Sequence, residues 1–62
     1  MDRTQLALDA HAHPDVWWAG HDASAAGKPA TACPYGPENE RMMNVWLSGH
    51  VTSTEERDAR GG

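Results

Sequence analysis

The chain has 62 residues and a net charge of -4, with 5 Lys and Arg against 9 Asp and Glu. This length allows one domain at most, and a single cysteine excludes an internal disulfide. Because only 39% of the residues are hydrophobic, we expect a thin core that a homodimer or a larger partner supports. Without a long apolar run or a basic leader, we expect a cytoplasmic protein with no membrane partner.

Residues 1–13 allow two predictions. Thr4 can cap a short helix from Gln5 to His11, with Leu6 and Ala10 on one side. An unfolded arm fits the same residues equally well.

A helix is predicted over residues 14–27. Pro14 suits its first turn, and Pro29 prevents its continuation. Its small and apolar positions recur at helical spacing: Val16, Gly20, Ala23 and Gly27. Such a stripe allows a second helix to approach closely, and Gly27 is expected to cap the C-terminus.

The linker, residues 28–36, contains the tripeptide Cys33-Pro34-Tyr35. The tripeptide is apolar for a loop, so we expect it to pack over the neighbouring helices. Cys33 is interpreted as a small buried hydrophobic residue.

A second helix is predicted over residues 37–51, opened by Pro37. Its stripe contains Met43, Trp46, Leu47, His50 and Val51. Gly49 lowers helix stability, and we expect close packing against Gly20 and Ala23 to compensate. We therefore predict an all-α fold, a two-helix hairpin joined by the Cys-Pro-Tyr linker.

Residues 52–62 are polar. Thr52 with Glu55, or Ser53 with Glu56, could form a capping box for a last short helix. A frayed tail that ends in Gly61-Gly62 is the alternative. No internal repeat is identified along the chain.

The order of these elements resembles the ribosome modulation factor family. The match covers about Gly20 to His50 and requires two extra residues between Arg41 and Trp46. The matching residues are Gly20, Ala23, Ala26, Gly27, Lys28, Cys33, Pro34, Tyr35, Asn39, Arg41, Trp46, Leu47 and Gly49. Members are small bacterial proteins that bind the small ribosomal subunit and silence translation. The resemblance therefore implies a translation repressor that contacts rRNA or ribosomal proteins.

Five residues are candidates for binding. Trp17 and Trp18 point about 100° apart on a helix, so one is expected to be exposed at a partner surface. The alternative is that the second Trp covers the linker. As the resemblance implies, Lys28, Tyr35 and Arg41 could contact phosphate or stack on a base. The alternative is two solvated charges and a packed tyrosine.

Metal binding and catalysis are not expected. The histidines and Cys33 provide only one closely spaced pair, His11 and His13, so we predict no metal and no cofactor. Cys33 has no base beside it in the sequence, and no phosphate-binding glycine loop occurs. We therefore predict that the protein is not an enzyme.

The acidic charge supports a second functional hypothesis. RNA binding draws its affinity largely from Lys and Arg, which are few here. A small acidic protein of bacterial or phage origin could instead inhibit a host protein or nucleoprotein complex by covering its basic surface.

Overall fold

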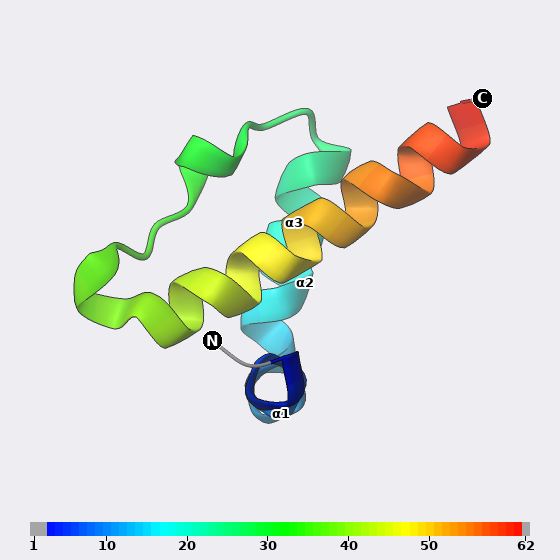
Figure 1. Ribbon diagram of the computed structural model, residues 1–62. Coiled ribbons are helices and arrows are strands. Elements are labelled where there is room, and N and C mark those ends of the chain that lie inside the picture. The colour runs from blue at the N-terminus through cyan, green and yellow to red at the C-terminus, as the bar shows by residue number, and fades with distance from the viewer. Residues whose placement is uncertain (1–2, 62) are drawn as a thin grey trace.

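A computed structural model describes residues 3–61 and consists mainly of α-helix (Figure 1). It contains α1 (Arg3–Ala12), α2 (Pro14–Ala25) and α3 (Glu40–Gly61). Two short 3-10 helices, η1 (Ala30–Ala32) and η2 (Pro37–Asn39), lie in the connection, and the described residues contain no strand. The all-α prediction is confirmed, and the N-terminal segment forms a helix. Met1, Asp2 and Gly62, which end the predicted arm and tail, lie outside the described residues.

The ends of α2 follow from its sequence. Pro14 occupies the first turn, and the carbonyl of His13 accepts hydrogen bonds from the N–H groups of Val16 and Trp17. At the other end, Gly27 has φ 81, a conformation that glycine adopts without a steric penalty. The N–H of Gly27 donates to Ser24 and that of Lys28 to Ala23, each at 2.9 Å. The prediction that Gly27 caps this helix is confirmed.

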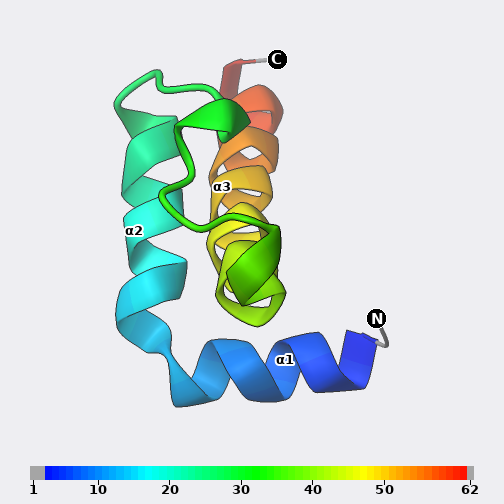
Figure 2. The ribbon, with the colours of Figure 1, turned by 90° about the vertical axis from the view of Figure 1, so that its left-hand side faces the viewer.

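The connection, residues 26–39, returns the chain to the end where α2 began (Figure 2). As a result α2 and α3 run in the same general direction. A hairpin would set them antiparallel, so the hairpin part of the prediction is wrong. The connection is long enough for this path, because a helix of 12 residues is only about 18 Å long. Cys33 and Tyr35 pack against the core from the connection, as predicted.

The two helices cross at a pair of glycines. A Cβ atom on Gly20 would overlap the carbonyl oxygen of Trp46 and lie 3.2 Å from the amide nitrogen of His50. Reciprocally, a Cβ on Gly49 would overlap the carbonyl oxygen of Trp17 and lie 3.1 Å from the nitrogen of His21. Backbone therefore packs directly on backbone. Close packing of Gly49 against α2 is confirmed, but the atoms that it meets are those of Trp17 and His21 and not those of Gly20 and Ala23.

This reciprocity reflects a repeat in the sequence. Residues 16–24 and 45–53 both read Val-Trp-x-x-Gly-His-x-x-Ser. In each copy the histidine ring stacks on the tryptophan one turn earlier, at 5.3 Å in α2 and 5.4 Å in α3. The statement that the chain has no internal repeat is therefore wrong. The two copies pack against each other with approximate two-fold symmetry.

The helix α3 differs from its prediction in its length and in which of its side chains face the core. It is continuous to Gly61, so the predicted break after residue 51 is wrong. Its buried apolar residues are Val45 and Trp46, whereas Val51 is 51% exposed. Ser53 is buried where α3 continues beside α2, and this packing stabilises the polar second half of the helix. The hydroxyl of Thr52 donates to the Ser48 carbonyl inside the helix and forms no capping box.

Candidate binding surfaces

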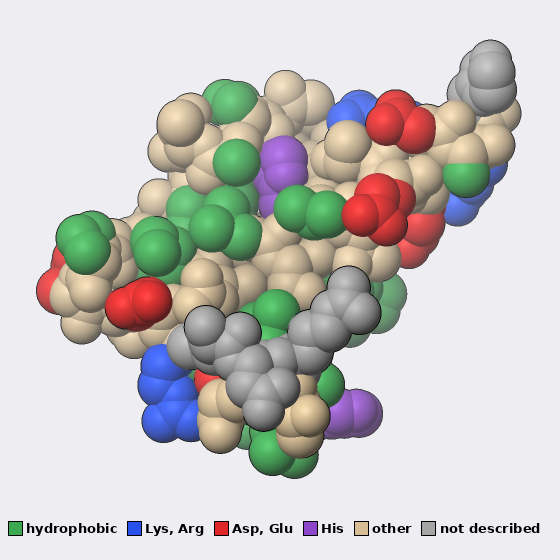
Figure 3. All heavy atoms as spheres, viewed as in Figure 1, with side chains coloured by type: hydrophobic (Ala, Val, Ile, Leu, Met, Phe, Trp, Pro, Cys, Tyr) green, Lys and Arg blue, Asp and Glu red, His purple; other side chains and the backbone are tan. Residues whose placement is uncertain are grey.

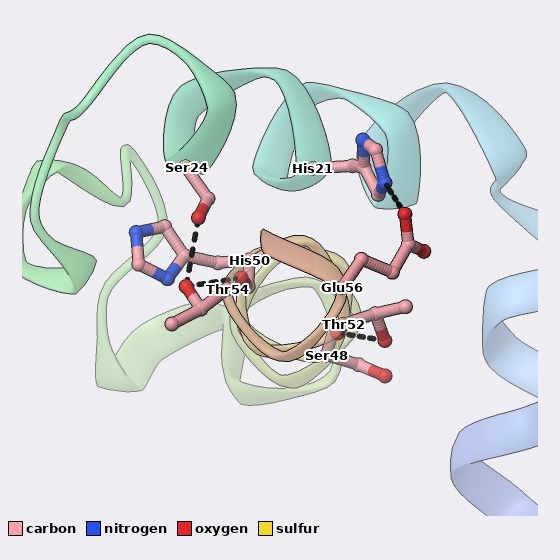
Figure 4. A network of polar contacts seen from close by, with 7 residues as sticks. All are labelled: His21, Ser24, Ser48, His50, Thr52, Thr54 and Glu56. Atoms are coloured by element: carbon pink, nitrogen blue, oxygen red, sulfur yellow. Dashed lines mark hydrogen bonds and ion pairs between the residues drawn. The ribbon is translucent and has the colours of Figure 1, made fainter. Parts of the chain in front are cut away.

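Polar side chains join α2 to α3 beyond the glycine crossing (Figure 4). Thr54 donates to the His50 carbonyl at 3.0 Å, so the Ser24 hydroxyl, 2.7 Å away, is the donor to Thr54. The Nε2 atom of His50 lies 2.8 Å from the Lys28 carbonyl and donates to it. His21 faces Glu56 at 3.5 Å. These contacts connect the C-terminal halves of the two helices.

Two of the histidines are thus engaged in helix contacts. Within residues 3–61, no three His, Cys, Asp or Glu side chains gather in a group that could hold a metal ion. No helix in this range has the length and hydropathy that a membrane span requires.

The aromatic pair on α2 is divided between core and surface. Trp17 packs against the core, and Trp18 is 54% exposed. Their rings meet edge to face at 4.9 Å, and His21 lies 5.1 Å from the Trp18 ring. The expectation that one of the two tryptophans is exposed is confirmed.

Arg41 holds α1 against the start of α3. Its Nη2 lies 2.9 Å from Asp9 Oδ1 and its Nε 3.3 Å from Oδ2. Asp9 is buried and also accepts a hydrogen bond from Gln5 at 3.1 Å. Hydrogen bonding to Arg41 lowers the pKa of the Asp9 carboxyl, more than burial raises it. Arg41 therefore has a structural role in addition to any contact with a partner.

The resemblance to the ribosome modulation factors requires two extra residues between Arg41 and Trp46, and these affect the direction in which Arg41 points. In a continuous helix they turn Arg41 by about 200° relative to Trp46, compared with the family pattern. The structure has such a helix from Glu40 onward, and Arg41 faces α1.

Lys28 and Tyr35 lie apart from the tryptophan pair. Lys28 is exposed immediately beyond the C-terminal end of α2, and Tyr35 is half-buried against the core. The candidate residues thus lie on three parts of the molecule: Trp17 and Trp18 on α2, Lys28 and Tyr35 on the connection, and Arg41 on α3.

Two further arginines, absent from the predicted binding residues, lie on the C-terminal half of α3. Arg57 and Arg60 line a hollow of ≈ 410 Å³ between α2 and α3, opposite His21 and Ala25. On the face shown in Figure 3, basic side chains appear near the start of α3 and along its C-terminal part. The Arg57–Arg60 spacing of three residues would have placed both on one helix face, but residues 52–62 were not expected to form a long helix.

A second surface that the sequence did not reveal lies along α1. Three adjacent hollows have volumes of ≈ 530, ≈ 380 and ≈ 220 Å³. Leu6 lines the first two and Trp17 the last two, so the three hollows adjoin one another in a row along α1. We name this row of hollows the α1 groove. Its apolar lining residues are Leu6, Ala7, Ala10, Pro14, Trp17, Trp18, Leu47 and Val51.

Comparison with protein-family models, curated proteins and solved structures finds no match to this chain. The resemblance to the ribosome modulation factors remains a prediction.

Proposed function

We propose that the chain is a ribosome modulation factor-like protein that associates with the small ribosomal subunit and represses translation. One observation supports this proposal: the residues that carry the resemblance occupy positions on which the fold depends. Gly20 and Gly49 allow the helices to cross, Gly27 caps α2, and Cys33 packs on the core. The shared pattern is therefore a set of fold-determining residues, which argues against coincidence.

In this role the protein acts by binding and carries out no reaction. Its contact with rRNA would involve Lys28, Arg57 and Arg60, which lie beyond α2 and on the C-terminal half of α3. Tyr35 lies on the same connection as Lys28 but nearer the start of α3, so it would provide a separate ring contact.

Sedimentation with purified ribosomal subunits tests the proposal. We expect the protein to sediment with small subunits and not with large ones, and to inhibit translation in a reconstituted system. The double variant Lys28→Glu/Arg60→Glu should weaken association by about tenfold or more, and wild-type binding should fall with salt. Glu38→Lys, an exposed change on η2, is the charge-reversal control. Absence of small-subunit association at low salt would contradict the proposal.

A second candidate function is favoured by the exposure of Trp18 and by the net charge of -4. The protein would then be a small acidic inhibitor, bacterial or phage-encoded, that covers a basic surface of a host protein or nucleoprotein complex. Affinity capture from host lysate with RNase distinguishes the two functions. A non-ribosomal complex that survives RNase and is lost on Trp18→Ala would support the inhibitor.

A further inference from the structure

The α1 groove has apolar anchors at its two ends that the chain leaves uncovered. Trp18 is 54% exposed at one end and Val51 is 51% exposed at the other. Between them lie Leu6 and Leu47, which are half-buried. A large tryptophan and branched aliphatic side chains along one groove are typical of a surface that receives an apolar helix face.

The rim of this groove is acidic. Glu40 lines it directly, and α3 continues past Val51 with Glu55 one turn later on the same face. At the Trp18 end, Asp22 follows one turn later on α2. All three carboxylates are exposed.

Four of the five Lys and Arg residues are absent from the groove lining: Lys28, Arg41, Arg57 and Arg60. Arg41 contacts Asp9, and Lys28 lies beyond the far end of α2. Arg57 and Arg60 line the separate hollow that faces His21. In Figure 3, acidic side chains recur along the C-terminal half of α3 and near η2. His11 also lines the groove, but Glu40, Glu55 and Asp22 are the carboxylates at its rim, and these carboxylates complement a cationic partner.

From this combination we propose that the α1 groove binds a basic amphipathic helix of a partner protein. Its apolar face would cover Trp18 and Val51, and its Lys and Arg residues would meet Glu40, Glu55 and Asp22. A second copy of this chain fits less well, because its net charge of -4 repels an acidic rim. The inference rests on the proposed role of the protein in binding, but it requires no contact with RNA.

Two synthetic helices of about 18 residues test the groove directly. The basic peptide has Leu on one face and Lys on the other. The acidic control peptide has the same sequence with Glu in place of Lys. Calorimetry and tryptophan fluorescence should detect micromolar binding of the basic peptide, at least tenfold tighter than that of the acidic one.

Variants of the full chain locate the binding. Trp18→Ala should raise the Kd about tenfold or more, whereas Leu8→Ala should leave it unchanged. Leu8 is the matched control because it is 59% exposed yet lies outside the groove lining. Glu55→Lys should weaken binding about threefold or more, and Glu38→Lys should not. Circular dichroism checks that each variant folds, and Val51→Lys replaces Trp18→Ala if that variant does not.

Several outcomes would overturn the inference. They are no binding of the basic peptide, equal binding of the acidic peptide, or an equal loss of binding in Leu8→Ala. Light scattering that shows a dimer held through Trp18 would assign the groove to a second copy. If the protein associates with small subunits but does not bind the basic peptide, only the groove proposal is rejected. If it binds the peptide but not small subunits, only the ribosomal role is rejected.

Discussion

The crossing of α2 and α3 and the junction of α1 with the rest of the molecule differ in how closely they pack. At the crossing, Gly20 and Gly49 leave no room for even a methyl group. At the α1 junction, the α1 groove remains, and the charged pair of Arg41 and Asp9 connects the elements. The crossing fixes the fold, whereas the α1 junction leaves apolar surface available to a partner.

This difference is one of chemistry as well as of distance. The crossing is formed by backbone and small side chains, which tolerate almost no change in volume. At the α1 junction, an ion pair with one exposed partner adds less to stability. The following substitutions should therefore separate the two regions.

The largest effect is expected at the glycines of the crossing. Gly20→Ala or Gly49→Ala should cost about 3 kcal/mol, because the added Cβ meets a backbone carbonyl that cannot move alone. Urea unfolding followed by circular dichroism measures the loss. Gly36→Ala is the control, since its Cβ meets only the flexible Glu38 side chain. If all three variants unfold at the same urea concentration, the crossing is not the tight region.

A smaller effect is expected at the cap of α2. Gly27 has φ 81 and a Cβ there would have no neighbour within 4 Å, so Gly27→Ala should cost about 1–2 kcal/mol through backbone strain alone. Gly27→Asn should cost less, because asparagine tolerates this conformation better. Thermal unfolding of the two variants compares them, and equal Tm values would argue against strain.

Removal of the buried hydroxyl pair should cost still less. Ser24→Ala is expected to cost about 1 kcal/mol, because Thr54 loses its donor. The double variant Ser24→Ala/Thr54→Val should lose less stability than the sum of the losses in the two single variants, since the two hydroxyls share one hydrogen bond. A double-mutant cycle from urea unfolding measures this coupling. Strict additivity would mean that the two side chains act independently.

The smallest effect is expected at the α1 junction, and it depends on pH. The pKa of Asp9 is lowered in the folded protein by its hydrogen bond to Arg41. The stability it contributes is therefore present above the unfolded pKa of about 4 and is lost as the pH falls through the lower folded value. Asp9→Asn should reduce stability near pH 6. The variant should also lose less stability than the wild type as the pH falls, because it has no carboxylate at this position to protonate. The Tm measured from pH 6 to pH 3 tests this, and parallel curves for both proteins would contradict it.

Local signals were sufficient to predict much of the fold. Pro14 and Gly27 mark the ends of a helix by their backbone chemistry, and Gly49 within an apolar stripe indicates a close contact. The full length of α3 could not be predicted in this way, because contacts with α2 stabilise its polar second half.

The candidate surfaces were less predictable. The Arg41–Asp9 pair joins residues that are far apart in sequence, and the α1 groove depends on where α1 docks. The repeat, in contrast, was available in the sequence. Aligning residues 16–24 with 45–53 would have predicted both the Trp–His stacks and the symmetric crossing.

The return path of residues 26–39 has a consequence for the integrity of the protein. Because this covalent tether holds two similar helices together, each meets the other at an effective concentration of roughly millimolar. Its stretch from Pro29 to Ala32 is exposed and open to a protease. A single cut there would make the association of α2 and α3 bimolecular, so the stability of the folded protein would depend on its concentration.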